Sequence, residues 1–317
     1  MIRAPRLLIQ RAGFIFTPQK VILMSHLEDP RSKYPVISPP EQTQPEPGLD
    51  QKMEPLADLG EKTYQGNGRL AGRNALITGG DSGLGAAVAI AYAREGANVA
   101  ISYLPEEEPD AELIIKAIEE AGVKALALPG DLRELKQCQA IVEKTVEAFG
   151  GLDIVVNNAS RQVWHERIED LSDEDFDHTM KANVYSAYRV TKAAVPHLKP
   201  GSSIIFTSSI QAYEPSETLL DYALTKAAQN NFSKGLAQAL APRGIRVNAV
   251  APGPFWTPLQ PSYGQPMEKL TQFGQDTPLG RAGQPAEIAG AYVFLASDDA
   301  SYVAGETLGL TGGRPTP

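Results

Sequence analysis

From residue 74 onwards, short runs of β-branched and apolar residues alternate with longer stretches that have a helical pattern. The runs expected to form strands are 74–78, 98–102, 124–128, 153–157, 202–207, 246–250 and 306–310. Helix-like stretches lie near 84–95, 110–121, 134–149, 173–198, 219–241 and 285–297. Such alternation is typical of βαβ crossovers and predicts an α/β fold, a doubly wound parallel sheet of about seven strands with helices on both faces. Ligands of that fold bind beyond the carboxyl ends of the strands.

Composition divides the 317 residues into three parts. Residues 24–69 are rich in Pro, Gln, Glu and Gly and lack helical or alternating apolar spacing, which predicts an extended arm on the surface. Residues 70–317 carry the strand and helix pattern and are long enough for one domain with a sizeable core. Residues 1–23 form a separate upstream segment.

The segment 1–23 contains Arg3, Arg6, Arg11 and Lys20 but no acidic residue, a composition also found in transit peptides. It lacks the apolar stretch and the small-residue cleavage site of a secretory signal. Alternatively, translation begins at Met24 and the preceding residues are not native.

Charge and cysteine content argue against several classes of protein. The net charge of -9 repels nucleic acid and anionic membranes, and no basic patch offsets it. The single cysteine, Cys138, cannot form an internal disulfide, and no stretch approaches the ~20 apolar residues of a spanning helix. We therefore expect a soluble, cytoplasmic protein. The histidines lack the spacing of metal ligands, so we expect them on the surface and no metal site: His26, His165, His178 and His197.

Residues 78–85, TGGDSGLG, join the first expected strand to the first expected helix. Glycines at such a turn allow tight backbone angles and let a pyrophosphate approach the helix N-terminus, where the helix dipole favours negative charge. The loop is the predicted phosphate-binding turn of a Rossmann-type domain, although a glycine-rich turn can also serve only for close packing. The expected contacts are Gly79, Asp81, Ser82, Gly83, Leu84 and Gly85.

The end of the second strand is where this fold reads the adenosine ribose, and an acidic residue there selects NAD. This chain has Ser102 and Tyr103 at that place, with no Arg or Lys beside them to bind the 2′-phosphate of NADP. Asp81 in the glycine loop adds negative charge near this site. We expect Glu106–Glu108 to form the solvated start of a helix rather than to bind the ribose. The cofactor is therefore NAD or NADP, with Tyr103 as an expected contact and the preference open.

Four features occur in order along the chain: TGGDSGLG, NNA at 157–159, Ser209, and Tyr222 with Lys226. Together they resemble the short-chain dehydrogenase/reductase family from about residue 70 to the C-terminus. SYLPEEE, SSIQAYEPS and GRAGQPAEIAGAYVFLASDDASYVAGETLGLTGG are similar to its glucose/ribitol-dehydrogenase-like branch of general stress proteins and aldehyde reductases. The resemblance implies a homotetrameric NAD(P)-dependent enzyme that interconverts an alcohol and a carbonyl of a small aldehyde, ketone, sugar or polyol.

The resemblance also implies cofactor contacts beyond the glycine loop. GDL at 130–132 matches the family's adenine-binding position, and PGP at 252–254 matches the loop beside the nicotinamide. The implied contacts are Asp131, Leu132, Asn158, Ala159, Tyr222, Lys226, Pro252, Gly253 and Thr257.

Tyr222 and Lys226 stand four positions apart in an expected helix, so their side chains share one face. One such pair can arise by chance, but Ser209 at the end of the fifth strand makes the combination specific. A carbonyl that is being reduced develops negative charge on oxygen, and a proton donor there lowers the barrier. Tyr222 is the expected acid or base. Lys226 is expected to favour its phenolate, because a free phenol with a pKa of ~10 is a poor base.

We expect Ser209, rather than its neighbour Ser208, to donate to the substrate oxygen. The resemblance assigns Asn183 to holding a water that joins the lysine to solvent, although an interior Asn can also simply satisfy backbone groups. The predicted catalytic set is Asn183, Ser209, Tyr222 and Lys226.

Substrate choice is expected to depend on residues after the fourth and fifth strands and on a mobile lid at 255–276. Ser160 replaces the glycine of the usual NNAG motif, and its side chain narrows or polarises the site near the nicotinamide. The expected walls are Gln162, Gln211, Tyr213 and Trp256, although Trp256 can equally pack the lid on the body.

Two other classes of protein would share parts of this pattern. A cofactor-binding regulator or scaffold without catalysis is the main alternative, but it would not need Ser209, Tyr222 and Lys226 together. An epimerase or dehydratase on a related fold would add a larger C-terminal domain than the ~60 residues after Trp256 allow.

Overall fold

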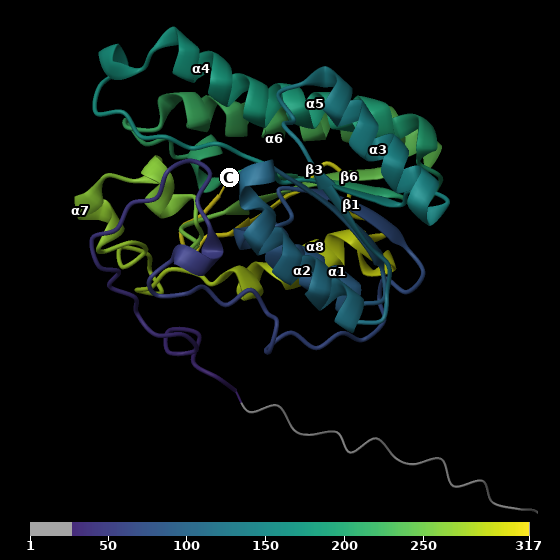
Figure 1. Cartoon of the computed structure of the whole chain (residues 1–317), viewed down its shortest axis with the longest axis horizontal. Coiled ribbons are helices and arrows are strands. Elements are labelled where there is room, and N and C mark those ends of the chain that lie inside the picture. The colour runs from purple at the N-terminus through teal and green to yellow at the C-terminus, as the bar shows by residue number, and fades with distance from the viewer. Residues whose placement is uncertain (1–26, 317) are drawn as a thin grey trace, which may run out of the picture.

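The computed structural model describes residues 27–316, so the segment 1–23 lies outside the described range. Its centre is one parallel sheet of seven strands in the order β3-β2-β1-β4-β5-β6-β7, which confirms the predicted doubly wound fold (Figure 1). The strands are β1 (Asn74–Thr78), β2 (Asn98–Tyr103), β3 (Ala125–Pro129), β4 (Ile154–Asn157), β5 (Ser203–Thr207), β6 (Arg246–Pro252) and β7 (Thr307–Leu310). The strand order reverses between β1 and β4, the point where such sheets bind ligands.

Helices cover both faces of the sheet (Figure 1). One face carries α1 (Gly83–Arg94), α2 (Glu108–Glu120) and α8 (Pro285–Ala296). The other carries α3 (Leu135–Phe149), α5 (Ser186–Ala194) and α6 (Leu220–Leu240), with α4 (Asp173–Met180) continuing this layer. The short α7 (Met267–Leu270) lies in the segment predicted as a lid.

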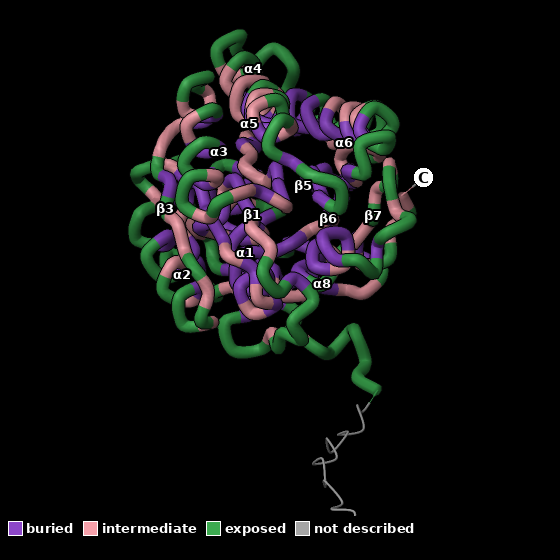
Figure 2. Tube along the Cα trace, turned by 90° about the vertical axis from the view of Figure 1, so that its right-hand side faces the viewer, coloured by how far each residue is buried: buried purple, intermediate pink, exposed green. Residues whose placement is uncertain are grey.

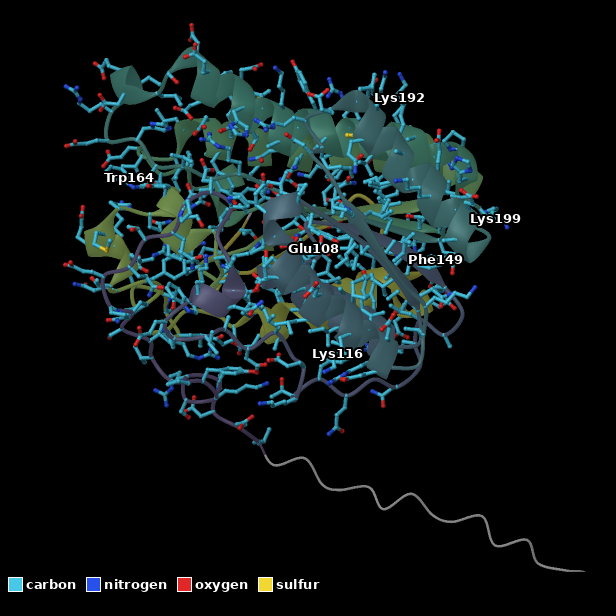
Figure 3. The ribbon with its side chains drawn as sticks, viewed as in Figure 1. Glu108, Lys116, Phe149, Trp164, Lys192 and Lys199 are labelled. Carbon is cyan, nitrogen blue, oxygen red and sulfur yellow. The ribbon has the colours of Figure 1, made fainter. Side chains whose placement is uncertain are left out.

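Alternation along each strand divides the core into two parts. In β1, Ala75 and Ile77 pack with α1 and α8, whereas Leu76 packs on the opposite face with α3. Buried residues therefore concentrate in the sheet and on the inner sides of its helices (Figure 2). Charged ends such as those of Lys116 and Lys192 point outward (Figure 3).

The helical stretch predicted at 173–198 is not one regular helix. A π-helical turn, Lys181–Tyr185, separates α4 from α5, and it carries the predicted site residue Asn183. Single π turns inside helices often occur at functional sites.

The arm has little regular structure, and parts of it are buried against the domain. Ile37 and Met53 join a small apolar cluster with Trp256 and Phe273. The indole N–H of Trp256 donates to the carbonyl of Pro55 at 2.7 Å. The arm is therefore more than a surface segment, because it encloses one side of the domain.

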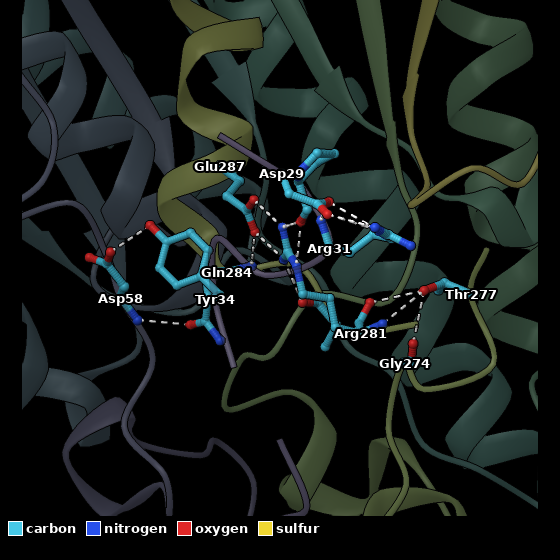
Figure 4. A network of polar contacts seen from close by, with 11 residues as sticks. Asp29, Arg31, Tyr34, Asp58, Gly274, Thr277, Arg281, Gln284 and Glu287 are labelled. Atoms are coloured by element: carbon cyan, nitrogen blue, oxygen red, sulfur yellow. Dashed lines mark hydrogen bonds and ion pairs between the residues drawn. The ribbon is translucent and has the colours of Figure 1, made fainter. Parts of the chain in front are cut away.

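Two polar networks attach the arm to the domain. Beside the start of α8, Tyr34 donates to Asp58 at 2.7 Å, and the Asp58 N–H donates to Gln284 at 2.9 Å (Figure 4). In the same region Arg281 pairs with Glu287 at 2.7 Å and donates to the carbonyl of Pro30.

The second network surrounds Glu95, which follows α1 and is fully buried. Its carboxylate accepts from the Tyr64 hydroxyl at 2.6 Å, from the Asn67 N–H at 2.9 Å, and from the backbone and guanidinium of Arg69. Burial by itself raises the pKa of Glu95, but these hydrogen bonds outweigh burial and lower it to about 2. The arm thus supplies the hydrogen bonds that keep this buried carboxylate charged, and the same bonds attach the arm to the domain.

Among the described residues, none of the helices is both long and apolar enough to cross a membrane.

We expect Glu95→Gln to lower the free energy of unfolding by ~2 kcal/mol at pH 7, since it weakens several charge-assisted hydrogen bonds. Because folding lowers this pKa, the stabilisation is present above pH 4.5 and is lost as the pH falls through about 2. Urea denaturation of wild type and variant from pH 7 to pH 3 measures the difference, which should shrink below pH 4.5. Glu143→Gln, an exposed position on α3, is the control. Equal unfolding midpoints for wild type and Glu95→Gln at pH 7 would contradict this role.

Candidate active site

One cavity of about 1210 Å³ lies at the carboxyl ends of the strands, where the fold predicts a ligand. It exceeds the ~300–1,000 Å³ common for small-molecule sites, and so has room for a dinucleotide beside a small substrate. Most predicted site residues line it: Gly79, Asp81, Ser82, Gly83, Leu84, Tyr103, Asp131, Leu132, Asn158, Ala159, Ser209, Tyr222, Lys226, Pro252, Gly253 and Thr257. Gly85 and Asn183 do not line the cavity.

The glycine loop has the close contacts of a phosphate-binding turn. Gly79 and Gly83 have positive φ angles of 60° and 49°, which favour glycine. A Cβ on Gly85 would lie 1.8 Å from the carbonyl oxygen of Gly79. Gly85 therefore allows α1 to pack closely against the loop, and its contact with the cofactor stays a prediction.

A chain of hydrogen bonds joins this loop to the ends of β4 and β5. The Thr78 hydroxyl accepts from the N–H groups of Asn158 and Ala159 at 2.9 and 3.0 Å. The side-chain amide of Asn158 donates to the Gly79 carbonyl at 2.9 Å and accepts from the Thr207 hydroxyl at 3.1 Å. This framework leaves a preformed groove along the strand ends, which fits a dinucleotide.

Carboxyl groups gather at the end of the cavity formed by β2 and the glycine loop. Burial raises the pKa of Asp81 to about 7, and burial together with the charge of Asp81 raises that of Glu107 to about 9. Glu107 lines the cavity and accepts from the Leu104 N–H at 2.8 Å. The expectation that residues 106–108 are merely solvated is thus wrong for Glu107.

The arm adds residues that the sequence pattern did not reveal. Glu46, Pro47 and Gly48 line the cavity. Asp50 accepts from the N–H of Gly83 at 2.7 Å, so an arm carboxyl meets the start of α1. Only the tertiary fold brings these residues to the loop, because the arm has no regular pattern that indicates its path.

Tyr222 and Lys226 lie in the first two turns of α6, with relative exposures of 7% and 1%. The ammonium nitrogen of Lys226 is 5.3 Å from the centre of the Tyr222 ring and donates to the Thr207 carbonyl at 2.7 Å. Ser209, just after β5, lies close enough to Tyr222 to lower the pKa of its phenol, and its hydroxyl accepts from the Gln211 N–H at 3.1 Å. The three predicted groups therefore meet at one place.

Burial opposes charge on both the tyrosine and the lysine. It raises the pKa of Tyr222 to about 12, against a lowering effect of the Ser209 hydrogen bond, and lowers the pKa of Lys226 to about 7. The expectation that the lysine favours the phenolate therefore requires that nearby acceptors keep its ammonium charged.

Asn183 lies behind this group rather than in the cavity. Its side chain accepts from the Arg161 N–H at 2.7 Å and donates to the Arg161 carbonyl and to Thr225. The hydroxyl of Ser208 is used in a bond to the Lys226 carbonyl at 3.1 Å, which leaves Ser209 as the serine beside Tyr222.

The substrate side of the cavity carries both polar and apolar side chains. Gln162, Gln211 and Ser160 line it as expected. Trp256 and Tyr213 do not, which corrects their prediction as walls. Trp256 is buried against the arm, and the Tyr213 hydroxyl accepts from Asn230 at 2.7 Å.

The histidines also differ in part from the surface prediction, since His165 and His178 are half-buried and His178 lines the cavity. His26 lies outside the described residues. Within residues 27–316, no group of three or more His, Cys, Asp or Glu side chains is arranged to hold a metal ion.

Residues 79–314 match the family described as "Enoyl-(Acyl carrier protein) reductase". The chain is 57% identical over 291 residues to "Uncharacterized oxidoreductase YghA" of Escherichia coli, covering 92% of this chain and 99% of the relative. It is 42% identical over 291 residues to "Glucose and ribitol dehydrogenase homolog" of Oryza sativa, covering 87% and 96%. A short-chain dehydrogenase from Burkholderia cenocepacia, solved in complex with NADP, has 35% identity and a TM-score of 0.72, covering 77% of this chain and 98% of that chain.

Proposed function

The chain belongs to the short-chain dehydrogenase/reductase family and is an NAD(P)-dependent oxidoreductase, and we propose that Tyr222 exchanges the proton that accompanies hydride transfer. The observation that carries this role is the meeting of Tyr222, Ser209 and Lys226 in one cavity. A regulator or scaffold would have no use for this arrangement, so the non-catalytic alternative is not favoured.

A bound nicotinamide dinucleotide supplies or accepts the hydride. Tyr222 gives its proton to the carbonyl oxygen in reduction and takes a proton from the alcohol in oxidation. Because the Ser209 oxygen accepts from the Gln211 N–H, its own hydrogen can stabilise the substrate oxygen. Lys226 favours the phenolate when its ammonium is charged.

The groups that would hold the dinucleotide follow the strand ends. The glycine loop and the start of α1 would hold its phosphates, Tyr103 and Asp131 its adenosine, and Lys226 its nicotinamide ribose. Asp131 is already paired with Arg133, which donates from Nε at 2.7 Å, so its carboxylate is held in a fixed position. The remaining contacts are Gly79, Asp81, Ser82, Gly83, Leu84, Leu132, Asn158, Ala159, Pro252, Gly253 and Thr257.

The substrate we propose is a small aldehyde, ketone, sugar or polyol. Ser160 and several Gln side chains on the substrate side can bind hydroxyl groups, which favours hydroxylated substrates. The Oryza relative named after glucose and ribitol dehydrogenase is consistent with this class.

The carboxyl groups at the end of the cavity beside β2 favour NAD over NADP, because NADP carries an additional phosphate. The phosphate that distinguishes NADP would lie near the end of β2, where Asp81 and Glu107 line the cavity. Arg133 lines the same end, but it is paired with Asp131. The Burkholderia structure contains NADP, so the inference rests on this chain's own carboxyl groups.

We expect kcat/KM with NADH to exceed that with NADPH by ~10-fold or more, the effect of ~1.4 kcal/mol of like-charge repulsion. Because burial raises the two pKa values to about 7 and about 9, the carboxyl groups lose protons as the pH rises from 6.5 to 9, and discrimination should grow over that range. Initial rates with both cofactors measure it. Leu104→Arg should narrow the ratio, whereas Leu104→Gln is the uncharged control. A preference for NADPH at every pH would reject the inference.

Tyr222→Phe should lower kcat by ~100-fold or more, because it removes the acid-base group while keeping the ring. The test is a panel of aldehydes, ketones, sugars and polyols assayed with NADH and NADPH. Dinucleotide affinity, measured by calorimetry, should stay within a few-fold of wild type. Equal rates in the two proteins would remove Tyr222 from this role.

The proposed assembly is a homotetramer that works in the cytoplasm. Large apolar side chains are exposed along α4 to α6, a surface that a second copy of the chain can cover: Phe176, Tyr185, Tyr188, Leu220 and Leu224. Light scattering of the native enzyme from a cytoplasmic extract should give four times the mass of one chain, and Leu224→Glu should reduce it. A wild-type mass equal to one chain, or absence from that extract, would contradict the corresponding part of the proposal.

A further inference from the structure

The ammonium group of Lys226 is buried with few partners. Its two acceptors are the Thr207 carbonyl at 2.7 Å and the side-chain oxygen of Gln229 at 3.4 Å. Among residues 27–316, no charged side chain contributes to its pKa, which burial lowers to about 7. A buried ammonium with three donors depends strongly on such neutral acceptors to stay charged.

Gln229 links the lysine to another part of the fold. It lies one turn further along α6 and is 3% exposed. While its oxygen faces Lys226, its amide nitrogen donates to the backbone carbonyl of Asn183 at 2.6 Å. Asn183 belongs to the π-helical turn between α4 and α5, so the amide bridges two helices.

The Asn183 side chain is not available for this link. Its carboxamide bonds the backbone of Arg161 in both directions and also donates to Thr225. These bonds fix the π turn against the loop after β4. The backbone carbonyl is therefore presented to Gln229 from a fixed position.

We propose that Gln229 is a positioning residue for Lys226, whose side-chain amide holds the ammonium in its charged form against the π turn. The inference rests on the proposed function, since it concerns the lysine that assists Tyr222. The amide accepts from the ammonium on its oxygen and donates to the Asn183 carbonyl on its nitrogen. Gln229 thus clamps the lysine between α6 and the π-helical turn.

The other titratable groups near Lys226 add no negative charge that would keep its ammonium charged. Tyr222 faces it from α6, and Tyr292 faces Thr207 from α8 with a hydroxyl contact of 2.7 Å. Burial raises the pKa of both phenols well above neutrality, so both are uncharged there. Losing the Gln229 oxygen should therefore lower the pKa of Lys226 further.

Gln229→Met tests the clamp, because methionine keeps the length and helix propensity of glutamine but removes its hydrogen bonds. Gln229→Ala is a second variant that leaves room for a water. Gln238→Met, at an exposed position of the same helix, is the matched control. Urea unfolding at pH 6 and pH 9 and the pH profile of alcohol oxidation are measured for all four proteins.

Gln229→Met should lose more stability at pH 6, where Lys226 is charged, than at pH 9, where it is neutral and needs the acceptor less. The rising limb of its oxidation profile should move about half to one pH unit higher, because a less charged lysine favours the phenolate less. Gln229→Ala should show a smaller pH-dependent loss of stability and a smaller shift of the oxidation profile, both in the same direction. If the Met variant does not fold, the Ala variant provides the test. Gln238→Met should match wild type in both measurements.

An equal loss of stability at both pH values would overturn the proposal, since it would show that Gln229 only fills space. If no substrate is turned over but the loss depends on pH as expected, the clamp on Lys226 stands and the proposed function fails. If the enzyme is active and the oxidation limb does not move, the clamp has no part in catalysis and the proposal is overturned.

Discussion

A single run of hydrogen bonds across the ends of the central strands holds the candidate site together. Tyr292 and Thr207 share a contact of 2.7 Å, the Thr207 hydroxyl donates to Asn158, and Asn158 donates to the Gly79 carbonyl. The carbonyl of Thr207 also accepts from Lys226. Because these buried groups satisfy one another, the glycine loop and the lysine cannot shift independently without leaving polar atoms unpaired. The residues proposed for cofactor binding and those proposed for proton transfer thus share one hydrogen-bonded framework.

Burial gives this site its electrostatic character. It disfavours charge on Tyr222 and Lys226 at one end of the cavity, and on Asp81 and Glu107 at the other. Neutral partners therefore decide which groups carry charge near pH 7. At the tyrosine end these partners are the Thr207 carbonyl and the Gln229 amide, whereas at the other end the Leu104 N–H donates to Glu107.

The arm is an integral part of the folded domain, in addition to the sheet and its helices. It encloses the indole of Trp256, surrounds the carboxylate of Glu95 and supplies part of the cavity wall. Its attachment at several separated points couples the lining of the cavity to the stability of the fold.

The sequence by itself determined the parallel sheet, the seven strands and most helices to within about two residues, the glycine loop, and the candidate group of Ser209, Tyr222 and Lys226. These are local signals, because strand alternation, helical spacing and a strand-to-helix glycine turn depend on neighbours in the chain. Tertiary structure decided that Gly85 packs against the Gly79 carbonyl, that Trp256 faces the arm, that Glu107 is half-buried, and that Gln229 bridges Lys226 and Asn183. Each of these depends on which distant segment lies against the residue, and side-chain burial and hydrogen-bond partners across such contacts leave no periodic trace in the sequence.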